Sequence, residues 1–341
     1  MSEFKLPSPR IVDPKSVPSL RWGIMGAAAI AHEFVAGAQK HTAQQIVAVA
    51  SRTPGKAQEF AAKFGLEHHD NYEDLLARPD IDVIYIPTLP TQHHAHALQA
   101  IAAGKHVLIE KPITMDAAQA EEIFAAARAK GVFAMEAMWT RYLPQYDIAR
   151  QLIENKTLGD IQVVNATFCT DNRDQPRLWA KGGGNPIIDM GIYSISFLQS
   201  FLGEPTEITA QAVLTEDKID KEVSVQLRYA NGARGYILSS AVATLPVTAT
   251  VSGTKGHMTM GPAFPVPSQI SISDNRFYYD TETWHDQGPA VGHNGLGYQA
   301  TYLAKFVSEG LVESPYESHA DSVANIRTAL KIMEIIGVEP F

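Results

Sequence analysis

Short apolar runs alternate with amphipathic segments over the first 140 residues of the chain. The apolar runs predict buried strands at 20–25, 45–51, 67–69, 82–87, 107–109 and 132–136. The segments between them have helical periodicity, at 29–40, 53–64, 71–78, 91–103 and 116–130. Strands that alternate with helices build a parallel sheet. We therefore predict an α/β fold whose N-terminal domain, residues 19–140, is a Rossmann-type doubly wound parallel sheet.

Residues that favour helix ends stand at several of the predicted boundaries. Asn71 and Asp116 each precede a helical segment and are good N-caps. Thr53 is a third candidate cap, with Pro54 at the first helical position. Gly131 follows the segment 116–130 and predicts its end.

The pattern changes after about residue 145, where strands dominate. Several runs alternate apolar and polar residues, which is typical of antiparallel strands with one covered face. They lie at 161–169, 206–215, 222–229, 233–241, 247–252, 256–260, 269–273 and 276–281, with helices predicted at 143–155, 189–202, 295–309 and 318–336. Asn231-Gly232 predicts a hairpin between two of these runs. We expect an α+β domain at 141–341, with a large, mostly antiparallel open sheet and a last helix that packs on the first domain.

Composition narrows the class of protein. The chain has 341 residues, 45% hydrophobic and 19% charged, with a formal net charge of −9, which argues against nucleic acid or anionic membranes as partners. Its one cysteine, Cys169, allows no intrachain disulfide and suits a reducing compartment. Residues 1–18 form a polar, proline-rich arm without the apolar core of a signal peptide. We expect a cytoplasmic enzyme with a loosely docked N-terminal arm.

The turn after the first strand resembles a dinucleotide loop. Gly26 occupies the first glycine position of the G-x-G-x-x-G pattern, and Ala28 and Ala31 occupy the other two. A helix that starts there presents free N–H groups to a pyrophosphate. Taken alone, the run also fits an ordinary alanine-rich helix, but its position after the first strand favours a cofactor site at Gly26, Ala28, Ala29 and Ile30.

The end of the second strand bears on the choice of cofactor. An NAD site places Asp or Glu here for the ribose 2′-hydroxyl, whereas this chain has Ser51-Arg52-Thr53. Ser51 can donate a hydrogen bond, and Arg52 can pair with a 2′-phosphate, so we predict NADP(H) over NAD(H). A solvated arginine before a helix is the alternative.

Two further strand ends carry candidate chemistry. The fifth strand runs into Glu110-Lys111-Pro112, at the edge where parallel sheets bind ligands. Lys111 could also simply mark the solvent end of the strand. After the fourth strand, Thr88, Leu89 and His93 should border the nicotinamide, although His93 fits a solvated helix start equally well. His93 and its neighbouring histidines do not have the spacing of a metal site.

Asp189 and Tyr193 are four residues apart on a predicted helix and would share one face. Asp189 also suits the helix N-cap, and Tyr193 also suits the core. By themselves these residues leave both interpretations open.

Taken together, the motifs resemble the Gfo/Idh/MocA oxidoreductase family, and within it the dimeric dihydrodiol dehydrogenase/D-xylose dehydrogenase (NADP) branch. The resemblance covers about residues 20–340. It is carried by Arg21-Trp22-Gly23-Ile24-Met25-Gly26, Glu110-Lys111-Pro112, Met135-Glu136-Ala137-Met138-Trp139-Thr140-Arg141, and Gly182-Gly183-Gly184 with Asp189-Met190-Gly191-Ile192-Tyr193. Ala28 in place of the second glycine and Asn185-Pro186 before the aspartate depart from the usual pattern.

The resemblance implies an NADP-dependent oxidoreductase acting on a secondary alcohol or hemiacetal of a sugar, polyol or cyclic trans-dihydrodiol. It implies that Lys111 lies near the nicotinamide ribose, with Glu110 beside it, that Tyr193 is the acid/base and that Asp189 orients the substrate. An ammonium near a phenol would lower the pKa of Tyr193. Candidate substrate contacts are Trp139, Arg141, Arg173 and Trp179; for the first two, a core indole and a junction salt bridge are the alternative.

Two other functions share this fold. One is a redox-silent NAD(P)-binding regulator, against which the intact Lys111, Asp189 and Tyr193 argue. The other is a glycoside hydrolase that retains NAD, for which an acidic residue would be expected at the position of Arg52. We also expect a homodimer, because the open sheet must bury its free face.

Overall fold

The computed structural model describes residues 4–180, 185–276 and 280–339. The chain forms two compact units, each discontinuous in sequence. Val12–Tyr142 and Gly288–Val323 form the first, here called the Rossmann unit. Residues through Ile11, Leu143–Gln287 and the chain from Ala324 form the second, here called the open-sheet unit. Two segments therefore differ from the ranges expected from the sequence: residues 4–11 lie with the open-sheet unit and 288–323 with the Rossmann unit.

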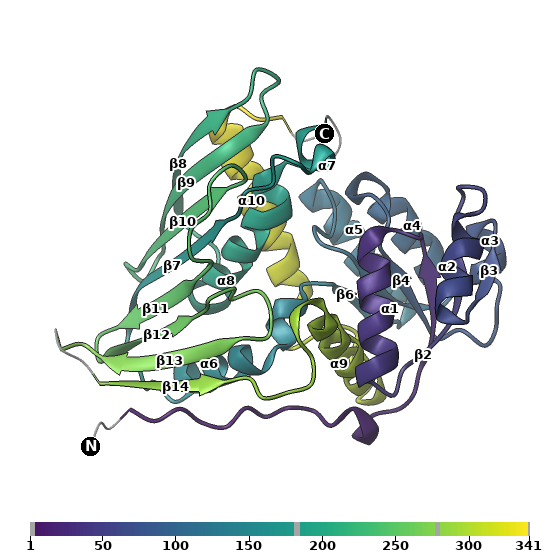
Figure 1. Cartoon of the computed structure of the whole chain (residues 1–341), viewed down its shortest axis with the longest axis horizontal. Coiled ribbons are helices and arrows are strands. Elements are labelled where there is room, and N and C mark those ends of the chain that lie inside the picture. Colours follow the sequence, from purple (N-terminus) through teal and green to yellow (C-terminus); the bar gives the residue numbers. More distant parts are fainter. Residues whose placement is uncertain (1–3, 181–184, 277–279, 340–341) are drawn as a thin grey trace. The chain divides into compact units, whose positions relative to one another are not determined.

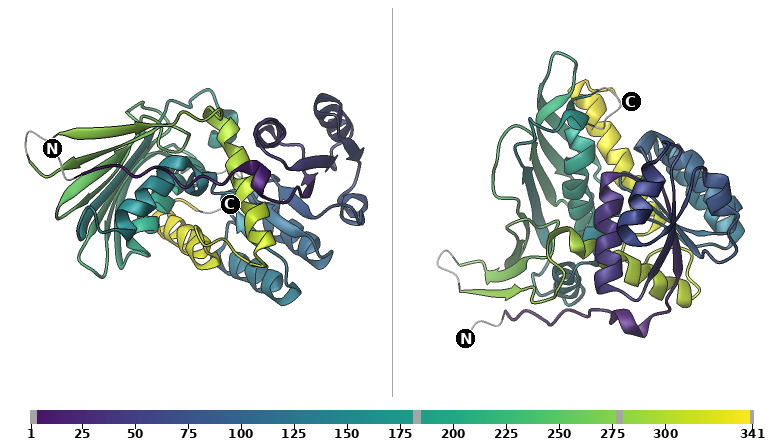
Figure 2. Two further views of the ribbon diagram at one scale, coloured as in Figure 1. Left: turned by 90° about the horizontal axis from the view of Figure 1, so that it is seen from below. Right: turned by 45° about the vertical axis from the view of Figure 1, so that its right-hand side comes forward.

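A six-stranded parallel sheet is the centre of the Rossmann unit, in the order β3-β2-β1-β4-β5-β6. Its central strands are buried along their length because helices cover both faces (Figure 2, right). The chain order reverses between β1 and β4, and this switch point is where such sheets hold ligands. The strands are β1 (Arg21–Met25), β2 (Gln45–Ala50), β3 (Glu67–His69), β4 (Val83–Ile86), β5 (His106–Ile109) and β6 (Ala134–Glu136).

The helices of this unit begin and end largely as their local sequence predicts. Asn71 accepts a hydrogen bond from Asp74 N–H at 2.7 Å, which confirms it as a cap. Asp116 does the same for Ala118 N–H at 2.7 Å. The prediction for Thr53 was wrong, because Gly55 adopts a left-handed conformation and the helix begins after it. The helices are η1 (Pro14–Ser16), α1 (Ala29–His41), α2 (Lys56–Phe64), α3 (Tyr72–Leu76), α4 (Pro90–Ala102), α5 (Ala117–Lys130), η2 (Trp139–Tyr142), η4 (Gly292–Gly295) and α9 (Leu296–Ser308).

The open-sheet unit contains an eight-stranded sheet in the order β14-β13-β12-β11-β7-β10-β9-β8. All its neighbouring strands are antiparallel except the parallel pair β7 and β10, so the predicted fold class is confirmed. The strands are β7 (Ile161–Cys169), β8 (Glu207–Leu214), β9 (Asp220–Arg228), β10 (Arg234–Ser240), β11 (Ala249–Gly253), β12 (Gly256–Met260), β13 (Gln269–Asp274) and β14 (Thr281–His285).

One predicted strand of this sheet is displaced. The sequence predicts a strand at 276–281, but the last strand begins at Thr281, and residues 277–279 lie outside the described part of the chain. Asp274 accepts the N–H of Arg276 at 2.9 Å, and this side-chain turn ends β13. The chain therefore turns at 274–276 before the next strand starts.

Helices cover one face of the open sheet (Figure 1). They include α6 (Pro144–Glu154), packed on β13, and α8 (Ile192–Leu202), packed on β7 and β10. The sequence predicts that the last helix, α10 (His319–Ile336), packs on the first domain; its first residues, through Val323, belong to the Rossmann unit. His319 stacks on Phe124 of the Rossmann unit, but from Ala324 onward α10 belongs to the open-sheet unit, where Gln199 donates to Thr328 at 2.6 Å.

The N-terminal arm is anchored more firmly than the sequence suggested. Arg10 N–H donates to the buried Asp147 carboxylate of α6 at 2.6 Å, and the Arg10 guanidinium pairs with the same carboxylate at 3.0 Å. Leu6 N–H donates to Glu282 of β14 at 2.8 Å. Burial of Asp147 favours its neutral form, but the bonds from Arg10 outweigh burial and lower its pKa. A buried carboxylate thus fixes the arm where composition alone predicts loose docking.

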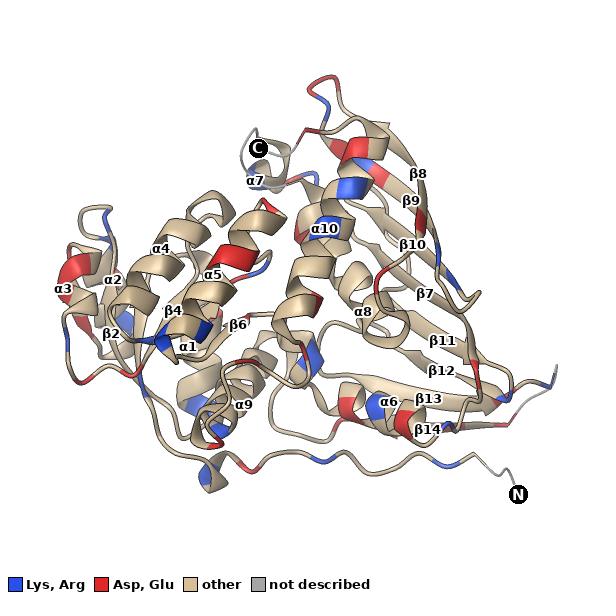
Figure 3. Ribbon diagram, turned by 180° about the vertical axis from the view of Figure 1, so that it is seen from behind, with Lys and Arg blue, Asp and Glu red and all other residues tan. Residues whose placement is uncertain are grey.

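Charged side chains of both signs are interspersed along helices such as α5 and α10 rather than gathered in a basic stripe (Figure 3). Within the described ranges, none of the helices combines the length and apolar character needed to cross a membrane.

Candidate active site

The turn from β1 into α1 has the geometry of a phosphate loop. Gly26 has φ +116°, and a Cβ there would lie 2.8 Å from Thr88 Cγ2, so only glycine fits. Helix α1 follows at Ala29, with Ile30 next, and no side chain caps its N-terminus at Ala28. The first N–H groups of α1 are thus positioned to bind an anion such as a pyrophosphate.

One cationic side chain, Arg52, follows the end of β2. Arg52 is exposed, and its guanidinium carbon lies 5.3 Å from the centroid of the Tyr72 ring. The Tyr72 ring in turn meets the edge of His96, whose Nδ1 is 3.0 Å from Thr88 Oγ1. Burial, aided by the charge of Arg52, lowers the pKa of His96 to about 4, so this histidine is neutral. Ser51 is buried and accepts a hydrogen bond from the N–H of Thr53 at 3.2 Å.

The loop after β4 differs in part from expectation. Leu89 is about half exposed and precedes α4. His93, predicted to touch the cofactor, is fully buried instead. Its ring nitrogens lie 2.9 Å from Thr88 O and 3.0 Å from Pro112 O. Burial lowers its pKa, and a neutral ring has one N–H, so it donates to one carbonyl at a time. We therefore reassign His93 from ligand contact to support of the loops after β4 and β5.

Lys111 follows β5, as predicted, and it is partly exposed. Glu110, expected among the cofactor contacts, is 6% exposed. The Tyr85 hydroxyl donates to its Oε1 at 2.6 Å, and Lys111 N–H donates to its Oε2 at 3.2 Å. Glu110 therefore acts on the backbone that carries Lys111.

Trp139 and Arg141 match the structural alternative better than the predicted substrate role. Both are almost fully buried. Arg141 lies 3.9 Å from the Glu317 carboxylate, and Trp139 lies 6.0 Å from the ring of His293. Both partners belong to the same Rossmann unit, so these side chains pack inside it.

The second group of candidate residues lies in the open-sheet unit. Asp189, for which the sequence leaves a helix cap as the alternative to a substrate role, lies in a π-helical turn, η3 (Ile187–Gly191). Its carboxylate accepts a hydrogen bond from Arg177 Nη2 at 2.8 Å. Tyr193 follows in the first turn of α8, with its ring centroid 5.9 Å from that of Phe168. π-Bulges of this kind are frequent at functional sites.

The loop before this turn is held by contacts within itself and with residues 240–242. Trp179 donates to Asn172 O at 2.9 Å, and Arg173 pairs with Asp171. The Gly182-Gly183-Gly184 motif lies outside the described residues. A direct contact between substrate and Arg173 or Trp179 remains a prediction.

One residue that the sequence did not single out supports the Asp189 turn. Asp220, at the start of β9, is 1% exposed and accepts the N–H of Ile187 at 2.8 Å. Burial raises its pKa to about 7. The sequence offered no signal for this contact, because the two residues are 33 positions apart.

The predicted nucleotide residues and Lys111 thus belong to the Rossmann unit, and Asp189 and Tyr193 belong to the open-sheet unit. Among the residues that the structure describes, no group of three or more His, Cys, Asp or Glu side chains is arranged to bind a metal ion.

Family models match both halves of the chain. One, described as the GFO/IDH/MocA oxidoreductase family with an NAD-binding Rossmann fold, matches residues 20–138. Another, the GFO/IDH/MocA C-terminal domain, matches 146–259. Similarity to curated proteins extends further. Trans-1,2-dihydrobenzene-1,2-diol dehydrogenase of Mus musculus is 36% identical over 327 residues, which cover 94% of this chain and 98% of the mouse protein. The Sus scrofa enzyme of that name is 35% identical over 330 residues, with the same coverage.

Solved structures show the same fold. KijD10, a 3-ketoreductase from Actinomadura kijaniata in complex with NADP and TDP-benzene, has a TM-score of 0.81 at 25% identity, over 94% of this chain and 98% of its own. A levoglucosan dehydrogenase in complex with NADH and levoglucosan has a TM-score of 0.83 at 21% identity, with the same coverage. The second likeness concerns the fold alone.

Proposed function

Because the chain belongs to the Gfo/Idh/MocA oxidoreductase family, we propose that it transfers a hydride between NADP and a secondary alcohol or hemiacetal of a sugar, polyol or cyclic trans-dihydrodiol. The observation that carries this proposal is the complete set of Lys111, Asp189 and Tyr193, each on a segment held by specific contacts. The relatives named dihydrodiol dehydrogenase support the substrate class.

The residues of the Rossmann unit fit NADP. Gly26 permits the tight turn, the uncapped start of α1 offers N–H donors to the pyrophosphate, and Arg52 provides a cation for the 2′-phosphate. Residues 51–53 carry no carboxylate that would repel that phosphate. The cofactor, when bound, supplies hydride acceptance and donation at its nicotinamide ring.

The protein's own groups manage the proton. In oxidation, the phenolate of Tyr193 takes the proton from the substrate hydroxyl as the hydride leaves the carbon. A positive charge beside a phenol lowers the pKa of the phenol, and this is the role that the proposal gives to the ammonium of Lys111. Asp189, held by Arg177, orients the substrate. In reduction the proton returns from Tyr193 to the carbonyl oxygen.

The test is a panel of aldoses, inositols and dihydrodiols with NADP, followed by the absorbance of NADPH. With the best substrate, Tyr193→Phe should lower kcat by at least about 100-fold while NADPH still binds. Tyr229→Phe is the matched control, because that buried hydroxyl has no hydrogen-bond partner among the described residues. Full turnover by Tyr193→Phe would refute the assignment. Absence of turnover together with tightly retained NAD would favour the glycoside hydrolase alternative.

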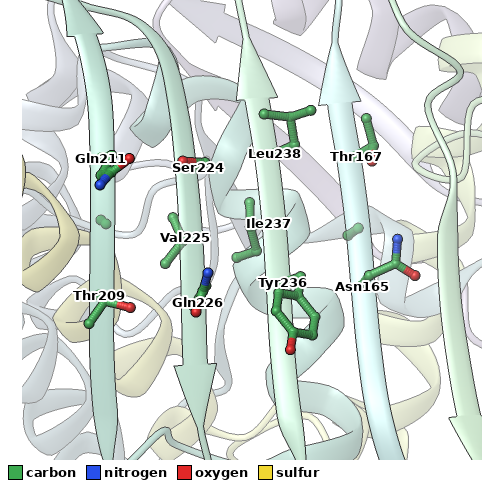
Figure 4. A pocket seen from close by; sticks show the side chains of 12 residues that line it. Asn165, Thr167, Thr209, Gln211, Ser224, Val225, Gln226, Tyr236, Ile237 and Leu238 are labelled. Carbon is green, nitrogen blue, oxygen red and sulfur yellow. The ribbon is translucent and has the colours of Figure 1, made fainter.

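We also propose that two copies of the chain pair through the free face of the open sheet. A hollow of about 390 Å³ on β7, β8, β9 and β10 is lined by uncharged residues, such as Thr167, Thr209 and Ser224 (Figure 4). Tyr236 and Val213 are 41% and 52% exposed on the same strands. A face of this kind suits a second copy. Light scattering should report a dimer, and a monomer at all concentrations would refute the proposal.

A cytoplasmic location is part of the proposal, on the basis of the single, buried Cys169. Fractionation of source cells would test it.

A further inference from the structure

The backbone after β5 is held at three consecutive residues by buried side chains. Lys111 N–H donates to Glu110 Oε2 at 3.2 Å. The carbonyl oxygen of Pro112 lies 3.0 Å from His93 Nδ1. Ile113 N–H donates to Glu136 Oε1 at 2.8 Å. The sequence motif contains the first of these side chains, and the fold supplies the other two.

Glu136 reaches Ile113 from the neighbouring strand. It is the last residue of β6 and pairs in register with Ile109, the last residue of β5. Its side chain therefore extends past the end of β5 to the segment that follows. It is 2% exposed, and Ile113 is fully buried, so the bond between them is shielded from water.

A buried network surrounds this carboxylate. Burial is the largest influence on Glu136 and raises its pKa to about 7; the Ile113 N–H, Ser322 and the charge of Arg141 oppose this rise, and Glu110 adds to it. Arg141 is in turn placed by Glu317. Ser322 and Glu317 belong to the late segment 288–323 that completes the Rossmann unit.

We propose that Glu136 is a positioning residue that fixes the direction in which Lys111 leaves the sheet; the inference rests on the proposed function, in which Lys111 assists Tyr193. Without an acceptor from Glu136, the N–H of Ile113 would be buried and unsatisfied, which is costly enough to move the segment. Lys111 lies only two residues away, so its ammonium would move as well. Small displacements of a positioned group lower kcat strongly and affect cofactor binding less.

Three substitutions at Glu136 distinguish the effect of side-chain length from the effect of charge. Glu136→Gln keeps the length and an acceptor oxygen but removes ionisation. Glu136→Asp keeps the charge but shortens the side chain by one methylene. Glu136→Met keeps the approximate volume and removes the acceptor. Asp147→Asn is the control, because Asp147 is also a buried carboxylate that accepts a backbone N–H. Asp147 contacts none of the motif residues of the Rossmann unit.

Each variant is measured for kcat, for NADPH affinity and for the rate of reductive methylation of Lys111, read by mass spectrometry. We expect kcat of Glu136→Gln to be close to that of the wild type, kcat of Glu136→Asp to be lower, and kcat of Glu136→Met to be lowest, reduced by about tenfold or more. The NADPH affinity of each variant should stay within about twofold of the wild-type value. The methylation rate of Lys111 should change by at least about threefold in the Asp and Met variants and remain unchanged in Gln and in the Asp147→Asn control.

Two results would refute the proposed role of Glu136. If Asp retains full kcat while Gln loses it, Glu136 acts through its charge and the proposal is wrong. If folded Asp and Met variants leave both kcat and Lys111 methylation unchanged, it is also wrong. If Met does not fold, the comparison of Gln with Asp still decides. Methylation needs no turnover, so a failure of the proposed reaction leaves this test intact.

Discussion

The most direct test of the buried support beneath the Asp189 turn is the pH dependence of stability in an Asp220→Asn variant. Asp220 is 1% exposed and accepts the Ile187 N–H at 2.8 Å. Asparagine keeps an acceptor oxygen of similar reach, so this contact survives. What the variant loses is the ionisable proton of a carboxyl whose pKa burial raises from 3.8 to about 7.

The direction in which stability changes with pH follows from this raised pKa. Between about pH 4 and pH 7 the folded protein binds a proton at Asp220 that the unfolded chain has released. The stability that this proton confers is fully present below the unfolded pKa and is lost as the pH rises through the folded pKa. A shift from 3.8 to about 7 corresponds to about 4 kcal/mol in total, of which about 2.5 kcal/mol is lost between pH 5 and pH 8.

The assay is urea unfolding of wild type and Asp220→Asn at pH 5, 6, 7 and 8, at fixed ionic strength. The free energy of unfolding of the wild type, relative to the variant, should fall by about 2.5 kcal/mol over this range. Asp147→Asn is the control of opposite sign. Bonds from Arg10 outweigh the burial of Asp147 and lower its pKa, so its contribution is lost as the pH falls. Parallel profiles for wild type and Asp220→Asn would refute the reasoning.

Three further predictions concern other contacts. Arg52→Ala should raise the KM for NADP by about 10- to 100-fold and that for NAD by less than about threefold, because only NADP offers the 2′-phosphate; equal losses in steady-state kinetics would contradict this. Gly26→Val should destabilise the fold by about 2 kcal/mol and weaken NADPH binding, because φ is +116° and the new Cβ would meet Thr88; fluorescence titration showing wild-type affinity would count against the phosphate loop. Arg10→Ala should lower the free energy of unfolding by about 1–2 kcal/mol at neutral pH, because the buried Asp147 loses a main partner; an unchanged denaturation midpoint would show that the arm adds no stability.

Local sequence signals predicted the elements well wherever the deciding contacts are local. The caps at Asn71 and Asp116 are examples, because each carboxylate or amide bonds an N–H two or three residues away. Thr53 failed, because Gly55 could adopt the left-handed conformation and start the helix later. The local pattern predicted an ordinary helix start at Asp189, whereas the chain forms a π-turn there, and the acceptor of the Ile187 N–H comes from β9.

The residues of the candidate site likewise divide into those that local sequence signals predicted and those whose role depends on distant segments. The sequence predicts Gly26, Arg52 and Lys111 as site residues, because each follows a buried strand at the edge where such sheets bind ligands. It did not distinguish residues that would contact a ligand from residues that hold the backbone around the site. His93 and Glu110 have suitable chemistry and suitable positions, yet both are buried against backbone groups. Burial depends on neighbours from distant segments, and no local pattern reports it.

By itself, the sequence determined the two-part architecture and the order of strands and helices, and it yielded the prediction of the oxidoreductase site, because hydrophobic periodicity and strand-end motifs act within a few residues. The tertiary structure alone decided which side chains hold those residues in place. Glu136 reaches Ile113 across 23 positions, and Asp220 reaches Ile187 across 33. A buried N–H needs an acceptor from whatever segment the fold brings to it, and that segment is fixed only when the sheets are assembled.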